Sequence, residues 1–139
     1  MKNKKQKGIL AVFLLCVCFF ISGCITRIEK EQKRKDLEYI LIDQEHLPEE
    51  MTGVLGQLKK KPFHFVYSDQ GKTYLAEGYG ACPTTGYTIE VKKLYETEHA
   101  VCLHTSLMGP ATGEETKEIT TFPYIVVEIS ETEKEVMFD

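Results

Sequence analysis

The chain has 139 residues, of which 42% are hydrophobic and 27% are charged, and its formal net charge at pH 7 is −4. This length suits one domain with a hydrophobic core. The acidic balance argues against nucleic acid as a partner, because binding to it depends on neutralising phosphates with Lys and Arg.

The N-terminal segment has the pattern of an export signal. Four lysines within residues 2–7 precede sixteen uncharged residues, 8–23. This run is shorter than the about 20 apolar residues of a transmembrane helix. It ends at Ile21-Ser22-Gly23-Cys24, which resembles the lipobox of bacterial lipoproteins.

The lipobox resemblance implies that residues 1–23 are removed and that Cys24 is diacylated. Two acyl chains hold a protein on a membrane where one does so only marginally. We therefore expect an exported protein, lipid-anchored to the outer face of the bacterial cell membrane. An uncleaved anchor or ordinary secretion, with Cys24 incidental, is the alternative.

Removing the signal changes the charge and the cysteine count. Lys plus Arg falls from 17 to 13 while Asp plus Glu stays at 21, so the mature net charge is −8. With Cys24 lipidated, only Cys82 and Cys102 remain. An oxidising compartment would allow them to pair, but the expected hairpin sets Cys102 opposite about Leu94. Both the free and the paired state stay open.

After the signal, residues 24–36 predict a charged stalk and residues 37–139 a single domain. The segment "LEYILID", residues 37–43, predicts a strand. A helix is expected between Pro48 and Pro62, with three lysines in its last turn, where the helix dipole favours them. Its apolar stripe for packing on a sheet consists of Met51, Val54, Leu55 and Leu58.

Beyond Pro62 the hydrophobic period changes from 3.6 to 2, which predicts strands. A hairpin turn is expected at residues 68–72. The next strands place Tyr87, Ile89, Val91 and Tyr95 on one face, then Val101, Leu103, Thr105 and Leu107. A long loop, a last strand over 117–129 bent at Pro123, and a short acidic tail complete the chain.

One helix followed by at least five closely spaced strands predicts a mainly β (α+β) fold. We expect a compact antiparallel β-sandwich or open barrel with one packed N-terminal helix.

The sequence offers little for catalysis. His99, Cys102 and His104 invite a metal site, but His99 falls in a turn and no second cluster supplies the remaining ligands. Cys82 is the candidate nucleophile, and no histidine is placed near it by sequence. We expect a non-catalytic protein with no cofactor and no metal.

The connection after Cys82, "PTTGY", combines stiff residues with one flexible residue. Pro83 fixes its own φ and Gly86 accepts a positive φ at no steric cost. Thr84 and Thr85 between them are β-branched and hydroxylated. This predicts a rigid exposed loop with outward-facing backbone groups, suited to binding because little entropy is lost on docking. The alternative is a plain strand corner with solvated threonines.

Residues 74–129 resemble the C-terminal domain of the PrcB family, subunits of bacterial surface protease complexes. The resemblance rests on "PTTGYTIEV" from Pro83, the hairpin that follows, the Gly109-Pro110 loop and "TTFPYIVVEI" from Thr120. It implies an exported accessory protein whose partner is a protein, with a role beside a protease.

The same loops are similar to those of chagasin-like inhibitors of papain-type cysteine proteases, which present three loops from an immunoglobulin-like sandwich. Pro83 to Tyr87 match the first loop, with Cys82 in place of an asparagine. Residues 109–113 offer "GPATG" for the Gly-rich second loop, and Phe122 to Tyr124 keep the proline and aromatic of the third without its arginine.

Together these segments predict the contact edge for a protein partner. The predicted function is that of a membrane-anchored, non-catalytic lipoprotein that serves as accessory subunit of a surface or secreted protease. A cysteine-protease inhibitor and a structural envelope lipoprotein are the alternatives. The contact residues are Pro83, Thr84, Thr85, Gly86, Tyr87, Gly109, Pro110, Phe122, Pro123 and Tyr124.

Overall fold

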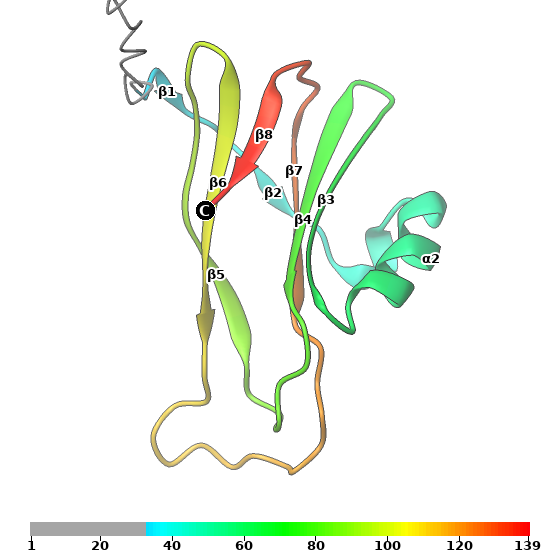
Figure 1. Ribbon diagram of the computed structural model, residues 1–139, viewed down its shortest axis with the longest axis vertical. Coiled ribbons are helices and arrows are strands. Elements are labelled where there is room, and N and C mark those ends of the chain that lie inside the picture. The colour runs from blue at the N-terminus through cyan, green and yellow to red at the C-terminus, as the bar shows by residue number, and fades with distance from the viewer. Residues whose placement is uncertain (1–32) are drawn as a thin grey trace, which may run out of the picture. The chain divides into compact units, whose positions relative to one another are not determined.

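The computed structural model describes residues 33–139 (Figure 1). The predicted signal of residues 1–23, the lipidation site Cys24 and most of the predicted stalk lie outside the described residues. Within residues 33–139, no helix has both the length and the apolar character needed to cross a membrane.

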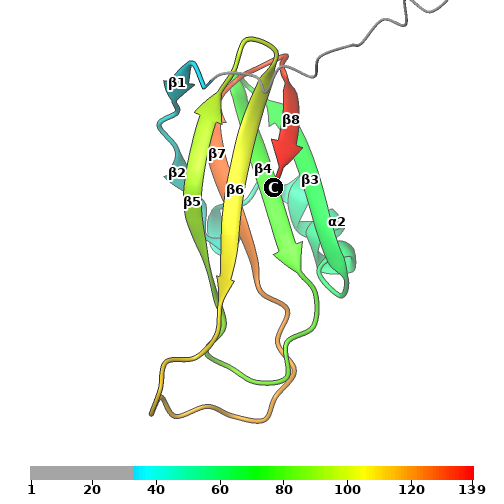
Figure 2. The ribbon, with the colours of Figure 1, turned by 60° about the vertical axis from the view of Figure 1, so that its left-hand side comes forward.

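The strands form two four-stranded sheets that face each other (Figure 1; Figure 2 turns the view). Neither sheet closes into a barrel, so the prediction of a mainly β sandwich is confirmed and the open barrel is set aside. The first sheet has the order β1 (Lys35–Asp36), β5 (Thr88–Glu96), β6 (Ala100–Met108), β8 (Glu135–Phe138). The second has the order β2 (Ile40–Leu41), β7 (Tyr124–Ser130), β4 (Lys72–Tyr79), β3 (Pro62–Asp69).

The N-terminal strand is divided between the two sheets. The sequence predicted one strand over residues 37–43, but β1 pairs with β5 in the first sheet and β2 pairs with β7 in the second. The chain crosses between them near Leu37, whose N–H donates to Leu94 O at 3.0 Å. Lys35 and Asp36, assigned to the stalk from sequence, are therefore part of a sheet.

A short 3-10 helix, η1 (Gln44–His46), leads into the α-helix α2 (Glu49–Leu58), which covers the outer face of the second sheet. Met51 and Leu55 are fully buried, as the apolar stripe predicts, whereas Val54 is 39% exposed. The helix ends at Leu58, so residues 59–61 follow it and do not form its last turn.

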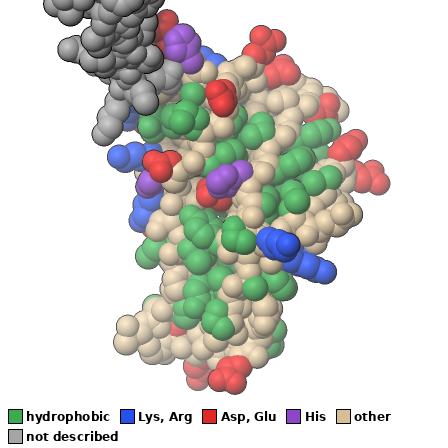
Figure 3. All heavy atoms as spheres, in the orientation of Figure 1, with side chains coloured by type: hydrophobic (Ala, Val, Ile, Leu, Met, Phe, Trp, Pro, Cys, Tyr) green, Lys and Arg blue, Asp and Glu red, His purple; other side chains and the backbone are tan. Residues whose placement is uncertain are grey.

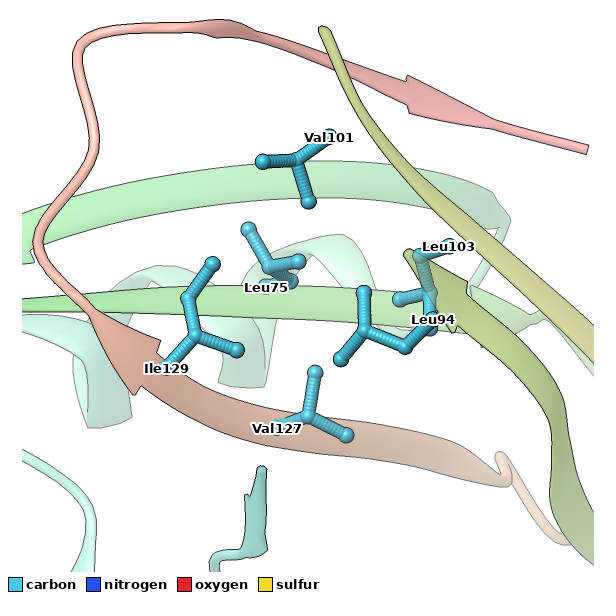
Figure 4. Close-up of a cluster of buried hydrophobic side chains, with 6 residues drawn as sticks. All are labelled: Leu75, Leu94, Val101, Leu103, Val127 and Ile129. Atoms are coloured by element: carbon cyan, nitrogen blue, oxygen red, sulfur yellow. The ribbon is translucent and has the colours of Figure 1, made fainter. Parts of the chain in front are cut away.

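Strand β4 is buried on both faces because it lies between the helix and the opposite sheet. Tyr74 and Ala76 pack toward the helix with Met51 and Leu55. The alternate residue Leu75 points into the sandwich, where six apolar side chains form the main core (Figure 4): Leu75, Leu94, Val101, Leu103, Val127 and Ile129. The β3–β4 hairpin closes on Gln70 and Gly71 at φ values of 49° and 78°, as a type I′ turn requires.

A β-bulge between Val91 and Lys93 corrects the predicted faces of β5. A bulge inserts one extra residue and reverses the alternation beyond it. Leu94 therefore points into the core and is only 4% exposed, while Tyr95 lies opposite Cys102 on the other face. The sequence had assigned Tyr95 to the face of Val91 and had set Cys102 opposite Leu94.

The predicted acidic tail contains another strand. Residues 135–138 form β8, which runs parallel to β6 with Val136 opposite Val101 and Phe138 opposite Leu103. Val136 and Phe138 pack against the main core. The strand before β8 also differs from the prediction. A strand was expected over residues 117–129, but β7 begins only at Tyr124.

Candidate protein-binding site

The predicted contact segments lie at one end of the sandwich, the lower end in Figure 1 and Figure 2. Two connections meet there, residues 80–87 between β4 and β5 and residues 109–123 between β6 and β7. We call these two connections the loop end. A short antiparallel bridge joins Cys82 to Thr121, with N···O distances of 2.8 and 2.9 Å.

Hydrogen bonds to the second connection hold the backbone of residues 84 and 85. Thr121 Oγ1 donates to Thr84 O at 2.8 Å, and Thr85 N donates to Lys117 O at 3.1 Å. The threonine hydroxyl of Thr85 in turn accepts from Lys117 N at 3.0 Å. The expectation of outward-facing backbone groups is therefore wrong for these two residues. Thr84 and Thr85 are also half-buried, so the alternative of solvated threonines does not hold either. These hydrogen bonds between the two connections restrict the motion of residues 84 and 85.

Glycine is required at position 86 for two reasons. Its φ of +92° lies in the left-handed region that side chains disfavour. A Cβ atom there would also lie 2.9 Å from Pro110 Cβ and 3.2 Å from Glu114 Oε1. The carboxylate of Glu114 is itself held by Ala111 N at 2.8 Å. The close approach of Gly86 and Pro110 thus joins two of the segments that the sequence had predicted to meet.

The accessible surface of the loop end comes largely from residues 111–120, which the sequence had divided between the long loop and the start of the last strand. Every residue from 111 to 120 is exposed, including Ile119, which is 55% exposed. Met108, at the end of β6, is 43% exposed, and Pro83 is exposed beside them. Three glutamates and one lysine make this surface acidic, as the lower tip in Figure 3 shows. The length of this segment and its many polar residues were the features of the sequence that indicated an exposed surface.

The third predicted segment is less accessible. Tyr124 opens β7 and packs against the helix-side core, with its ring centroid 6.3 Å from that of Phe63. Burial raises the pKa of the Tyr124 hydroxyl. Phe122 and Pro123 are half-buried, and Pro123 O accepts from Tyr79 N at 3.2 Å. These three residues therefore contribute little accessible surface to the loop end and mainly pack beneath it.

A chain of polar side chains lies inside the sandwich above the loop end. Thr105 Oγ1 donates to Glu77 Oε2 at 2.8 Å, and because its proton is used there, the Tyr79 hydroxyl donates to Thr105 Oγ1 at 2.7 Å. The other oxygen of Glu77 lies 3.2 Å from His64 Nε2. The His64 ring stacks on Phe138 at a centroid separation of 4.4 Å. This network connects β3, β4, β6 and β8.

The two cysteines of the described domain are both free, Cys82 buried and Cys102 half-buried. A hydrogen bond with Cys102 raises the pKa of the Tyr95 hydroxyl. Within residues 33–139, no three side chains of His, Cys, Asp or Glu come together as metal ligands would. His99 lies in the β5–β6 turn, as expected from sequence, away from a shared face with His104.

The loop end lies within one segment that matches a known family. Residues 73–130 match the family model described as PrcB C-terminal. The resemblance predicted from the loop motifs is therefore confirmed. No curated protein and no solved structure matches the chain.

The PrcB C-terminal segment runs from β4 through β7 and contains both connections of the loop end. It also contains Glu77, Tyr79 and Thr105 of the polar network. The helix α2, strand β3 and strand β8 lie outside the matched segment. The family match thus covers the site and the central strands β4 to β7.

Proposed function

We propose that this protein is a membrane-tethered, non-catalytic accessory subunit of a bacterial surface or secreted protease complex, and that the loop end contacts its partner. The observation that carries the proposal is the gathering of two braced connections at one end of the sandwich, inside the PrcB C-terminal segment. The lipobox ending at Cys24 supports a position at the outer face of the cell membrane.

The physical argument for binding is preorganisation. Association costs free energy when loops must become ordered, and a loop already held by hydrogen bonds avoids much of that cost. The bonds of Thr85 to Lys117 join residues that are 32 positions apart, so each connection limits the motion of the other. Exposed apolar side chains such as Ile119 and Met108 supply contact area amid threonines and glutamates.

The absence of catalysis is part of the proposal. A nucleophilic thiol needs access to substrate and a base within hydrogen-bond reach. Cys82 is 5% exposed, and its backbone is paired with Thr121. Its placement supports a structural role for this residue.

A matched pair of isoleucines tests the site. Ile119 is 55% exposed at the loop end and Ile40 is 61% exposed on β2. Each is replaced by Glu in the full chain, which is then cross-linked in native membranes and purified. We expect the unaltered chain and Ile40→Glu to retain a protease-complex component that Ile119→Glu loses, with unfolding temperatures unchanged. Equal recovery from both variants would remove the loop end from the contact.

A second candidate is inhibition of a papain-type cysteine protease. The observation that favours it is that the segments matching three inhibitor loops lie at the same end of a sandwich. If it holds, the full chain in detergent slows a papain-type enzyme at sub-micromolar concentration, and Ile119→Glu weakens this effect while Ile40→Glu does not. An enzyme of unchanged rate at high micromolar concentration rejects the candidate.

A further inference from the structure

Strand β3 differs from the other edge strands of the sandwich. The edges formed by β1 and β2 have two residues each and that formed by β8 has four, whereas β3 has eight. Proteins protect exposed edges by keeping them short, by bulges, or by lysines and prolines within them. From Phe63 to Ser68 the strand has no Lys, Asp, Glu or Pro, and its register with β4 has no bulge.

The free side of β3 presents three regularly spaced backbone positions. Asp69 and Lys72 flank the type I′ turn as a hydrogen-bonded pair, and such pairs alternate along an antiparallel ladder. His64, Val66 and Ser68 therefore direct their N–H and C=O groups away from β4. Within residues 33–139, no strand or loop other than β4 pairs with β3. Val66, at the centre, has 41% of its surface exposed.

We propose that β3 is the pairing edge for a second copy of this chain, joined antiparallel about a two-fold axis at Val66. In this register Val66 faces its own symmetry mate and His64 faces Ser68 of the other copy. All three outward positions are then hydrogen-bonded pairs, and a valine meets a valine at the centre. The second sheet of one copy and the second sheet of the other, each with the order β2-β7-β4-β3, then form one continuous sheet of eight strands.

The charges around β3 complement this arrangement. Lys59, Lys60 and Lys61 precede the strand and Asp69 ends it. Antiparallel pairing brings the basic start of each strand beside the acidic end of the other, whereas parallel pairing would set the lysines beside each other. On the helix side, Phe65 of one copy faces Tyr67 of the other, and aromatic cross-strand pairs stabilise sheets. No residue of the strand faces a like charge.

Single cysteines distinguish this register from random collision. In the full chain, in membranes under mild oxidation, Val66→Cys should form dimers because the paired Cα atoms lie about 5.5 Å apart, within disulfide reach. Ser68→Cys is the matched control, since its two copies would be offset by four residues, about 14 Å along the strand. Co-expressed His64→Cys and Ser68→Cys chains should cross-link to each other.

The expected result is at least five-fold more dimer from Val66→Cys than from Ser68→Cys, measured over the background of the unaltered chain with its own cysteines. Equal dimer from both variants, or none above background, overturns the proposal. As a second measurement, light scattering of the full chain in detergent should give a dimer for Val66→Thr and a monomer for Val66→Lys, which sets two lysines face to face. A dimer that persists in Val66→Lys also overturns it.

Discussion

The space between the two sheets has an apolar half and a polar half, and the same strand lines both. Leu75 and Glu77 of β4 point into this space two residues apart. Around Leu75 lie side chains such as Leu103 and Val127, each fully buried. Around Glu77 lie the hydroxyl of Thr105 and the imidazole of His64.

The two halves stabilise the protein by different physical means. Apolar burial is roughly proportional to the area removed from water and does not depend on direction. A buried carboxylate such as that of Glu77, 7% exposed, is tolerated only with hydrogen-bond partners at fixed positions. The polar half is the one nearest the loop end, because Tyr79 belongs to the network and also donates to Pro123 O. The hydrogen bonds of Tyr79 thus help to fix the positions of the strand ends from which the two connections of the loop end begin.

The largest expected effect is in the apolar half. Leu75→Ala should lower the free energy of unfolding by about 2–5 kcal/mol, because it removes a fully buried side chain and leaves a cavity. Leu41→Ala is the control, since Leu41 is 58% exposed on β2 and should change stability little. Urea denaturation of the full chain in detergent measures both. Similar midpoints for the two variants would contradict the assignment of Leu75 to the core.

A smaller effect is expected in the polar half. Glu77→Ala leaves the Thr105 hydroxyl without its acceptor and removes the contact with His64 Nε2, at a cost of about 1–3 kcal/mol. Glu77→Gln keeps the shape and one acceptor oxygen, so its cost should be lower. The same denaturation experiment ranks them. If Glu77→Ala unfolds at the same urea concentration as the unaltered chain, the network contributes nothing to stability.

The apolar half was largely predictable from the sequence, whereas the polar half was not. Alternation identified Val101 and Leu103 as one face, and local periodicity is enough for that. The partners of Glu77 come from β3 and β6, and no local pattern records which strands pair. The predicted face of Tyr95 was wrong for the same reason. The bulge that turns Leu94 into the core depends on pairing with the neighbouring strand, which no local pattern records.

The loop end was predictable only in part. The motif from Pro83 to Tyr87 and the need for glycine at position 86 follow from backbone chemistry, and the resemblance placed the loops at one end. The bracing of Thr85 by Lys117 links two connections far apart in sequence. Strand β8 escaped prediction because residues 135–138 are few and follow a run of glutamates that suggests a solvated tail.

A third variant tests whether the polar network reaches the loop end. Tyr79→Phe removes the hydroxyl that donates to Thr105 Oγ1 and keeps the ring, so stability should fall by only about 1 kcal/mol. Because the backbone N–H of residue 79 still bonds to Pro123 O, hydrogen exchange of the 80–87 amides should increase modestly. Exchange that increases instead at the opposite end of the sandwich, around residues 97–100, would contradict the connection.

The smallest effect is expected at the ion pair between Lys134 and Glu96, which lies near the surface at the end of the sandwich opposite the loop end. Lys134 Nζ donates to Glu96 Oε2 and to Thr97 O, both at 2.9 Å. The hydrogen bond from Lys134 lowers the pKa of Glu96 below its ordinary value of 4.5. A carboxyl with a lowered folded-state pKa stabilises the fold above its ordinary pKa, and this contribution is lost as the pH falls through the folded-state pKa.

Lys134→Met should therefore raise the pKa of Glu96 toward 4.5 and make stability less dependent on pH just below that value. Lys35 and Arg34 also lower this pKa, so the return should be incomplete. NMR titration of the Glu96 carboxyl carbon measures the shift directly. Lys72→Met, which breaks the pair with Glu128 on the other sheet, is the control and should leave the titration of Glu96 unchanged. A Glu96 titration that is the same in both variants would show that Lys134 does not control it. Lys134 and Glu96 are half-buried near the surface, and ion pairs near the surface contribute little to stability.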